Sequence, residues 1–265
     1  MPDISNIKIN KQDYRIDLKK PIDLSIPINN IKSRPLFYDN KPIKINYYTK
    51  NQETWSVKDG APCNIPIINL NIHCGATHTE CRSHITKEKM SVTDCIKNSL
   101  LLSHLISVTP SNKIENDSYH YPVNKNDLII TKDMLYKKIK DIKTPSLKSI
   151  IVRTLPNSEK RLSQNYNINK NAFFSNEAIY YLKSIGIENL IVDLPSIDKY
   201  DDGGKLGNHR IFWGVDKGPL NQNTITELTY IKNQIEDGEY LLSLNMLNLN
   251  LDASPSRPII YKVLK

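Results

Sequence analysis

The chain has 265 residues, and its 24% charged and 39% hydrophobic residues are typical of a folded globular protein rather than a disordered one. A net charge of +8 suggests a nucleic-acid partner, but 29 of the 36 basic residues are Lys and only 7 are Arg, which usually makes the bidentate contacts to phosphates and bases. No apolar run is long enough to span a membrane, and the N-terminal residues lack the apolar core of a signal peptide. We therefore expect a cytoplasmic protein that binds neither nucleic acid nor membranes.

The N-terminal part of the chain is polar and rich in proline. We expect residues 1–60 to form an extended, β-rich segment that wraps around a core made by residues 61–265, with one domain overall. The expected elements in this half are short strands at 21–28, 43–50 and 64–72 and a helix that runs into a strand at 91–108.

From residue 127 onward, strands and helices alternate, which predicts an α/β fold with mixed β-sheets wrapped by helices. Thr224 and Glu227 match a capping box, so residues 224–235 are predicted to be a helix. The other expected elements are a strand and a helix within 127–142, strands at 148–156 and 189–198, a helix at 175–187, and closing strands at 239–249 and 257–264.

The stretch HCGATHTECRSH, residues 73–84, holds three of the six histidines. On an extended strand, side chains two and six positions apart share a face, so two of His78, Glu80 and His84 can converge on one ion if the strand bends. Imidazole and carboxylate groups suit Zn, Mn or Fe, so this face is a candidate metal site. The alternative is a polar loop whose histidines form only local hydrogen bonds.

A fourth ligand from the same stretch has two candidates. His73 is five positions from His78, so a regular strand turns it to the opposite face unless Gly75 and Ala76 bend the chain. In strict alternation Cys74 shares the face of His78 instead, and a thiolate ligand favours zinc. Spacing alone leaves both open. No C-x-x-C pair occurs, so a zinc finger is not expected.

A second polar stretch follows the expected strand at 189–198. Asp193 and Asp198 lie at its carboxyl end, where α/β proteins usually place their sites, although Asp198 also fits a turn. His209 precedes an aromatic pair and is equally compatible with core packing. Glu227 is ambiguous too, because a capping-box glutamate needs no further function.

Several ordered motifs resemble the cyclase family, which includes bacterial kynurenine formamidases and isatin hydrolases. The histidine stretch is similar to the family pattern H-x-G-[TA]-H-x-D-x-P-x-H, and closer to a variant P-H-C-N-G-T-H-T-E-C-x-G-H. The resemblance runs from about residue 64 to 260 and includes, in the family's order, RTLPN (153–157), DLPSID (193–198), DGGKL (202–206), the His-x-x-Phe-Trp at 209–213, TITEL (224–228) and LDASPSRP (251–258).

The resemblance implies a set of site residues and an α/β fold of the swivelling β/β/α type. The implied metal ligands are His73, His78, Glu80, His209 and Glu227, and His84 is the implied acid–base catalyst. This chain departs from the pattern in three ways: Glu80 replaces an aspartate, the first histidine lies one residue further out, and Cys81-Arg82-Ser83 replaces A-P-x. Candidate substrate-binding residues are Trp55, Arg82, Phe212 and Trp213, each of which also fits an ordinary core or surface role.

The implied activity is metal-dependent hydrolysis of a C–N bond in a small amide, such as an N-formyl aryl amide of tryptophan catabolism or a cyclic amide. Its implied cofactor is one or two divalent ions, zinc first and manganese second, which activate water for attack on the amide. The implied assembly is a homo-oligomer, a dimer or a tetramer. The alternative function is a cyclase-like protein that binds metal and has no hydrolase activity.

Overall fold

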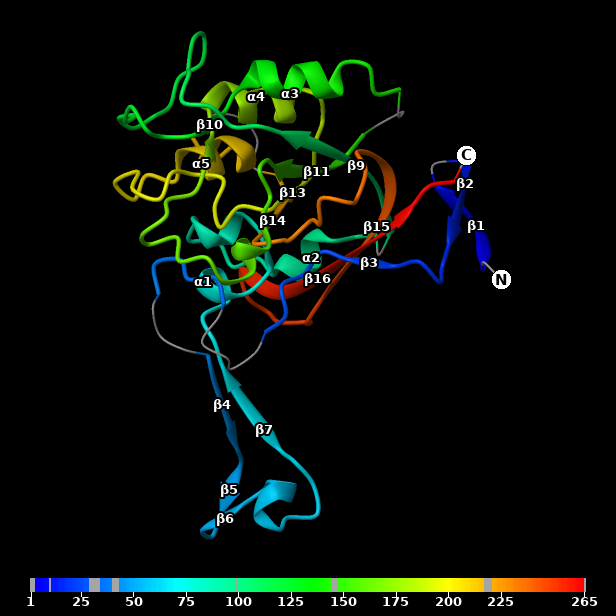
Figure 1. The fold of residues 1–265 in the computed structure, drawn as a ribbon, viewed down its shortest axis with the longest axis vertical. Helices are drawn as coiled ribbons and strands as arrows, with labels where there is room; N and C mark the ends of the chain where they lie inside the picture. The colour runs from blue at the N-terminus through cyan, green and yellow to red at the C-terminus, as the bar shows by residue number, and fades with distance from the viewer. Residues whose placement is uncertain are drawn as a thin grey trace.

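The protein is built on a closed barrel of seven strands. The computed structural model describes residues 3–9, 11–28, 34–39, 43–98, 100–143, 147–216 and 221–264. The barrel order is β15, β9, β11, β13, β14, β8 and β16, and pairing between β15 and β16 closes the ring (Figure 1). Neighbours from β9 to β14 are parallel and all other pairs are antiparallel. The strands are β8 (His78–Glu80), β9 (Leu100–Val108), β11 (Ser149–Thr154), β13 (Asn189–Val192), β14 (Thr224–Glu227), β15 (Gly238–Met246) and β16 (Ala253–Lys262).

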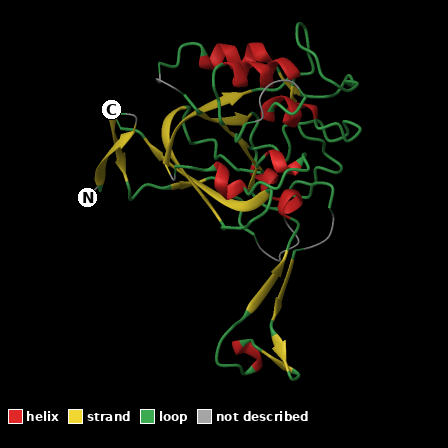
Figure 2. Cartoon of the chain, turned by 180° about the vertical axis from the view of Figure 1, so that it is seen from behind, coloured by secondary structure: helices red, strands yellow, loops and turns green. Residues whose placement is uncertain are grey.

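Side chains that alternate between the two faces of the parallel strands form two separate apolar cores. On β11, Ile151 points into the barrel, while Ile150 and Val152 pack under the helices outside it. The outer layer contains α3 (Lys132–Ile139), α4 (Asn176–Ser184) and α5 (Gly207–Trp213) (Figure 2). Thr131 and Ser175 cap α3 and α4 through their side-chain oxygens. A single α/β domain with mixed sheets and helices outside them is therefore confirmed.

The predicted helix at 224–235 is wrong, because residues Thr224–Glu227 form strand β14. This segment pairs with β13 on one side and with β8 on the other, and all four of its residues are buried. The β-branched residues in Thr-Ile-Thr fit such a buried ladder better than the Thr-x-x-Glu spacing fits a cap. Tertiary pairing thus overrides the capping-box pattern and places Glu227 beside β8.

The N-terminal part of the chain forms hairpins and one barrel-edge strand. Strand β1 (Ile4–Ile9) pairs with β2 (Gln12–Asp17), and the short β3 (Ile22–Asp23) adds to β16. Strands β4 (Lys44–Tyr47) and β7 (Pro66–Asn69) form an arm that projects from the body, with β5 (Thr49–Lys50), β6 (Glu53–Thr54) and the 3-10 turn η1 (Val57–Asp59) at its tip (Figure 1).

Short elements fill the connections. They are α1 (Ile72–Gly75), η2 (Arg82–His84), α2 (Val92–Cys95), β10 (Ile129–Ile130), η3 (Glu159–Ser163) and β12 (Phe173–Phe174). Within the described ranges, no helix is both long enough and apolar enough to cross a membrane.

Candidate metal centre

Strands β8 and β14 place three polar side chains on one face. His78 lies opposite Glu227, and Glu80 lies opposite Ile225. Because Ile225 belongs to the core beneath the helices, this face is the outer one, while the Thr79 and Thr226 hydroxyls meet at 2.8 Å on the other side. His78, Glu80 and Glu227 therefore project from the barrel wall toward the layer that contains α5.

The chain turns on both sides of β8, and these turns bring in two more histidines. His73 lies in the short helix α1, so it is not part of a strand. At Gly75 a Cβ atom would come within 2.2 Å of the Arg34 guanidinium, so a larger residue there would have to displace that side chain. His84 lies in the 3-10 turn η2 rather than on a continued strand, and the backbone N–H of His84 donates to Cys81 O. The expected single extended strand is thus replaced by helix, strand and turn.

Asp198 positions His209 on the first turn of α5. One Asp198 oxygen accepts from the backbone N–H of Asn208 at 2.9 Å, and the other lies 2.6 Å from His209 Nδ1. Tyr119 donates its hydroxyl to the same carboxylate at 2.9 Å. Asp198 is therefore both a cap for the helix and a partner that orients the His209 ring. The sequence indicated either a site residue at a strand end or a turn residue, without identifying this partner.

The five implied ligands come together in the structure, centred on Glu80. Its carboxylate oxygens lie 3.0 Å from His73 Nδ1, 3.8 Å from His78 Nε2 and 3.0 Å from His209 Nε2. Glu227 lies 3.7 Å from His78 Nε2 and 3.6 Å from His209 Nε2. Two groups with metal-like spacing share Glu80: one with His73 and His78, the other with His209 and Glu227.

The electrostatics of this cluster favour an ionised Glu80 and cationic rings at His73 and His209. Burial alone raises the pKa of Glu80, but His84, His209 and His73 outweigh it and hold this pKa well below its usual value. Burial lowers the pKa of His73, yet hydrogen bonds to Asp252 and Glu80 raise it to about 10. The pKa of His209 is raised in the same way by Asp198, Glu227 and Glu80.

Buried polar atoms in the cluster lack hydrogen-bond partners, which is the observation that tests its fit to a metal ion. Among the described residues, His78 Nε2 and Glu80 Oε1 are buried without a hydrogen bond. The other nitrogen of His78 lies 2.9 Å from the carbonyl oxygen of Ala76, so it must be the donor there and Nε2 keeps its lone pair. A lone pair held inward and a second nitrogen anchored outward is the arrangement of a metal-binding histidine.

Sequence reasoning missed Asp252, which lies at the outer rim of the cluster. Its Oδ2 is 3.2 Å from His73 Nε2 and 3.1 Å from His84 Nδ1. The residue belongs to the LDASPSRP stretch, but no local signal distinguishes it from a turn aspartate. A separate group formed by His120, Asp198 and Asp202 also has suitable spacing. Backbone N–H groups of 204–207 donate to Asp202 and His120 there, so that group is already satisfied.

The candidate substrate-binding residues lie in different surroundings. Phe212 and Trp213 have no exposed surface and belong to the core beneath the helices. Arg82 donates to Glu88 and to the carbonyl oxygen of Asn221. Trp55 directly follows β6 at the tip of the arm, away from the body of the same chain (Figure 1). Cys74 belongs to none of the metal-like groups in the described chain, and burial raises the pKa of its thiol.

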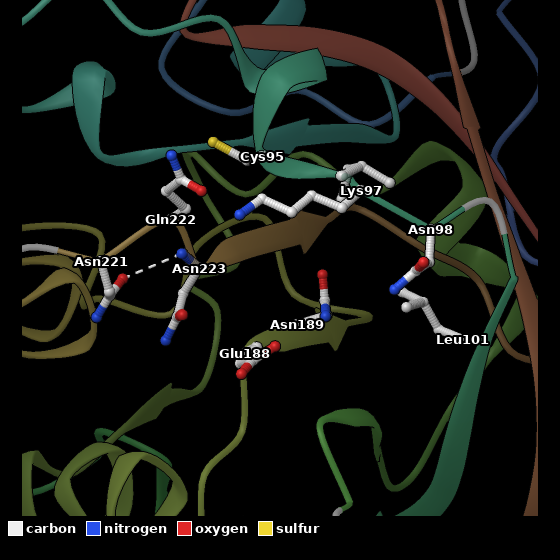
Figure 3. Close-up of a pocket in the computed structure, with 10 residues that line it drawn as sticks. Cys95, Lys97, Asn98, Leu101, Glu188, Asn189, Asn221, Gln222 and Asn223 are labelled. Atoms are coloured by element: carbon white, nitrogen blue, oxygen red, sulfur yellow. Dashed lines mark hydrogen bonds between the residues drawn. The ribbon is translucent and has the colours of Figure 1, made fainter. Parts of the chain in front are cut away.

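A cavity of about 330 Å³ lies apart from this cluster (Figure 3). It opens beside the first residues of β13 and β14, whereas Glu227 is at the other end of β14. Its amides are largely engaged: the backbone N–H of Asn223 donates to Asn221 Oδ1, and Asn189 Oδ1 accepts from Thr224. None of its lining residues belongs to the histidine–carboxylate cluster.

A protein-family model described as "Putative cyclase" matches residues 22–199, about two thirds of the chain. The chain belongs to this family. The matched span includes the whole histidine stretch and Asp198 but ends before His209, Glu227 and Asp252. The family model therefore says nothing about those three residues, and only their positions in the fold bring them to the histidine stretch.

Solved structures of cyclase-like fold are similar over nearly the whole chain. An isatin hydrolase bound to the product analogue thioisatinate is 15% identical, with a TM-score of 0.65, over 92% of this chain and 93% of the other. Isatin hydrolase A from Ralstonia solanacearum is 14% identical, with a TM-score of 0.63, over 91% of each chain. A protein described as a predicted metal-dependent hydrolase from Bacillus stearothermophilus is 19% identical, with a TM-score of 0.54, over 91% and 98%. At these identities the likeness concerns the fold. Curated protein sequences gave no match.

Proposed function

We propose that this chain is a metal-dependent hydrolase of C–N bonds in small amides. The observation that carries the proposal is the convergence of three imidazoles and two carboxylates, with His78 Nε2 buried and without a hydrogen bond. Buried polar atoms without partners cost about 1–3 kcal/mol each, so a folded chain rarely keeps them without a ligand. A divalent cation held here would give His78 Nε2 a partner and offset the negative charge of the two glutamates.

His73, His78, Glu80, His209 and Glu227 hold the ion or ions. Neutral imidazole and carboxylate together suit zinc, with manganese as the second candidate. His73 is preferred to Cys74, since its Nδ1 lies 3.0 Å from Glu80 while the Cys74 sulfur joins no such group. Glu80 belongs to two groups of donors, which supports a site for one ion or for two. When bound, such an ion would polarise a carbonyl and lower the pKa of a bound water to about 7.

His84 performs the proton transfer. Its Nδ1 lies against Asp252, and its Nε2 is turned toward Glu80 at 3.9 Å, beyond hydrogen-bonding distance. The side chain is 26% exposed, whereas His78 is fully buried. His84 is therefore placed to accept a proton at Nε2 and to return it to the departing nitrogen, a contribution of roughly 10²–10⁴ in rate.

The substrate is a small amide that reaches the cluster past His73, His84 and Asp252, the members of the cluster with exposed surface. Resemblance favours either an N-formyl aryl amide, which would place the enzyme in tryptophan catabolism, or a cyclic amide. The four cysteines are unpaired, which is consistent with a cytoplasmic location.

We further propose a homo-oligomer, a dimer or a tetramer, in which the β4–β7 arm contacts a second copy. The arm exposes Ile65, Ile67 and Ile68, and β7 pairs only with β4 among the described strands. An exposed apolar surface of this kind usually marks an interface. Light scattering on the wild type and on Ile67→Asp tests this proposal. We expect the mass of an oligomer for the wild type and a lower mass for the variant. The mass of a monomer for both proteins would refute it.

Metal analysis followed by a substrate panel tests the hydrolase proposal. The purified protein is assayed for bound zinc and manganese, then for turnover of aryl formamides, lactams and aryl amides. Metal-dependent hydrolysis that a chelator removes and added zinc restores is the expected result. Stoichiometric metal without turnover of any amide would favour the alternative, a metal-binding cyclase-like protein without hydrolase activity.

A further inference from the structure

Asp252 is fixed beside the cluster by the backbone around it. It lies immediately before β16, whose first residues pair with β8. The backbone N–H of Cys81 donates to the carbonyl oxygen of Asp252 at 3.0 Å, and Val92 donates to the carbonyl oxygen of Leu251 at 2.9 Å. These hydrogen bonds fix the backbone position of Asp252 relative to Glu80 and His84.

A single oxygen of Asp252 contacts two histidine rings. Oδ2 lies 3.2 Å from His73 Nε2 and 3.1 Å from His84 Nδ1, and the two rings stack with centroids 4.1 Å apart. A carboxylate oxygen only accepts hydrogen bonds, so the ring nitrogens that meet Oδ2 are both donors. The outer nitrogens of both rings are thus the ones that carry hydrogen.

The opposite nitrogens then face the cluster, where each would offer a lone pair once the ring is neutral. In a neutral imidazole one nitrogen donates and the other accepts. With Nε2–H directed to Asp252, His73 presents Nδ1 toward Glu80 at 3.0 Å. With Nδ1–H directed to Asp252, His84 presents Nε2 to the same side. The two rings need opposite tautomers, and a single acceptor placed between them selects both.

We propose that Asp252 is a positioning residue that fixes the tautomers of His73 and His84 together, and so links metal retention to proton transfer. This inference rests on the proposed function, because it takes His73 as a ligand and His84 as the acid–base group. In this inference Asp252 acts through the two rings rather than as a ligand, although its oxygen, His73 and His84 also have metal-like spacing.

The variants Asp252→Ala and Asp252→Asn separate this role from a purely structural one. The alanine variant removes the acceptor, and the asparagine variant keeps the shape but replaces the charged oxygen that receives both rings with a neutral, weaker acceptor. Both should weaken zinc binding by roughly 10–100-fold, the usual effect of losing a partner that orients a metal ligand. Both should also slow hydrolysis of amides much more than that of activated aryl esters, whose leaving groups need no proton.

A matched control is Asp23→Asn. Asp23 also interacts with β16, through Arg257, but lies outside the cluster. This variant should keep wild-type zinc affinity and the wild-type ratio of amide to ester turnover. Thermal melting of all three variants identifies any that fail to fold, and the asparagine variant is the one expected to fold like the wild type.

Nitrogen-15 NMR of zinc-loaded protein with labelled histidine tests the inference directly. In the wild type, we expect His84 to carry hydrogen on Nδ1 and His73 to carry it on Nε2. In Asp252→Asn, at least one ring should change tautomer or show a mixture, together with weaker zinc binding. Unchanged tautomers and unchanged zinc affinity in both variants would overturn the inference. Wild-type protein that binds zinc but hydrolyses no amide would refute the proposed function alone. The tautomers of His73 and His84 and the zinc affinity would still test the role of Asp252.

Discussion

Glu80 and His209 meet at 3.0 Å, with both side chains almost completely buried. Glu80 belongs to β8 and His209 to α5, so this contact joins the barrel wall to the helical layer outside it. His209 is held from behind by Asp198 at 2.6 Å, which leaves its Nε2 facing Glu80. The pair is the centre of the proposed metal site, and most of the expected behaviour of the protein follows from it.

Metal binding should release protons. Without metal, the pKa of His73 is raised to about 10 and that of His209 is raised as well, so both rings are protonated at pH 7. An ion needs the lone pairs that these protons occupy, so affinity should rise with pH up to about pH 10. Calorimetry in buffers of different ionisation enthalpy should show roughly one to two protons released per ion at pH 7. His73→Gln should release about one fewer, and a binding enthalpy that is the same in every buffer would contradict this reading.

Removing a ligand should abolish metal-dependent turnover. His78→Ala deletes a fully buried donor, and Glu227→Gln removes one negative charge while keeping the shape. Each variant should lose its bound metal. Its kcat/KM should fall by at least roughly 10²-fold, because the bound ion supplies several kcal/mol of transition-state stabilisation. Full activity and full metal content in Glu227→Gln would exclude Glu227 from the site. His104→Gln, a change on β9 in the barrel wall, is the matched control for substituting a histidine.

His84→Ala should keep its metal and lose rate. The His84 ring lies further from Glu80 than those of His73 and His209, and it is partly exposed. We expect kcat to fall by roughly 10²–10⁴ while zinc content stays at the wild-type level. Elemental analysis and steady-state kinetics on one preparation decide between the two roles. Release of the metal would identify His84 as a ligand instead.

Asp198→Asn should weaken the site without removing a ligand. Asp198 accepts from His209 Nδ1 and from the backbone of α5, so the asparagine variant disturbs both the ring and the helix start. A loss of roughly 10–100-fold in metal affinity or activity is expected. Competition with a zinc-binding dye measures this loss, and wild-type affinity in Asp198→Asn would mean that His209 needs no partner to orient it.

Phe212→Ala should affect stability rather than substrate recognition. Phe212 has no exposed surface and packs in the core beneath the helices. Truncation should cost about 3–5 kcal/mol in the free energy of unfolding. Urea denaturation measures the cost. A normal unfolding midpoint with a raised KM would instead place Phe212 in the substrate pocket.

Local sequence patterns predicted the regular parts of the fold well. The buried runs at 149–154 and 189–192 are strands, and the Ser175 cap begins a helix as expected. The shared face of His78 and Glu80 also follows from simple alternation. Strand β14 was predicted to be a helix, because its pairing with β13 and β8 decides its conformation and leaves no trace in the spacing of Thr224 and Glu227.

The outer part of the site was beyond sequence reasoning for a similar reason. His84 approaches Glu80 through a 3-10 turn, and His73 through a short helix, neither of which has a clear local signal. Asp252 lies 168 positions from His84, and only the pairing of β16 with β8 brings the two together. Long-range strand pairing, rather than local propensity, therefore determines which aspartate joins the cluster.

The most direct test of the central claim is the metal content and activity of Glu80→Gln beside the wild type. Glu80 is the residue that both groups of donors share, so its charge holds the whole site together. The account predicts one or two divalent ions per wild-type chain with metal-dependent amide hydrolysis, and neither in Glu80→Gln, which should remain folded. Wild-type protein that takes up no divalent metal, or a Glu80→Gln variant that keeps both metal and activity, would contradict it.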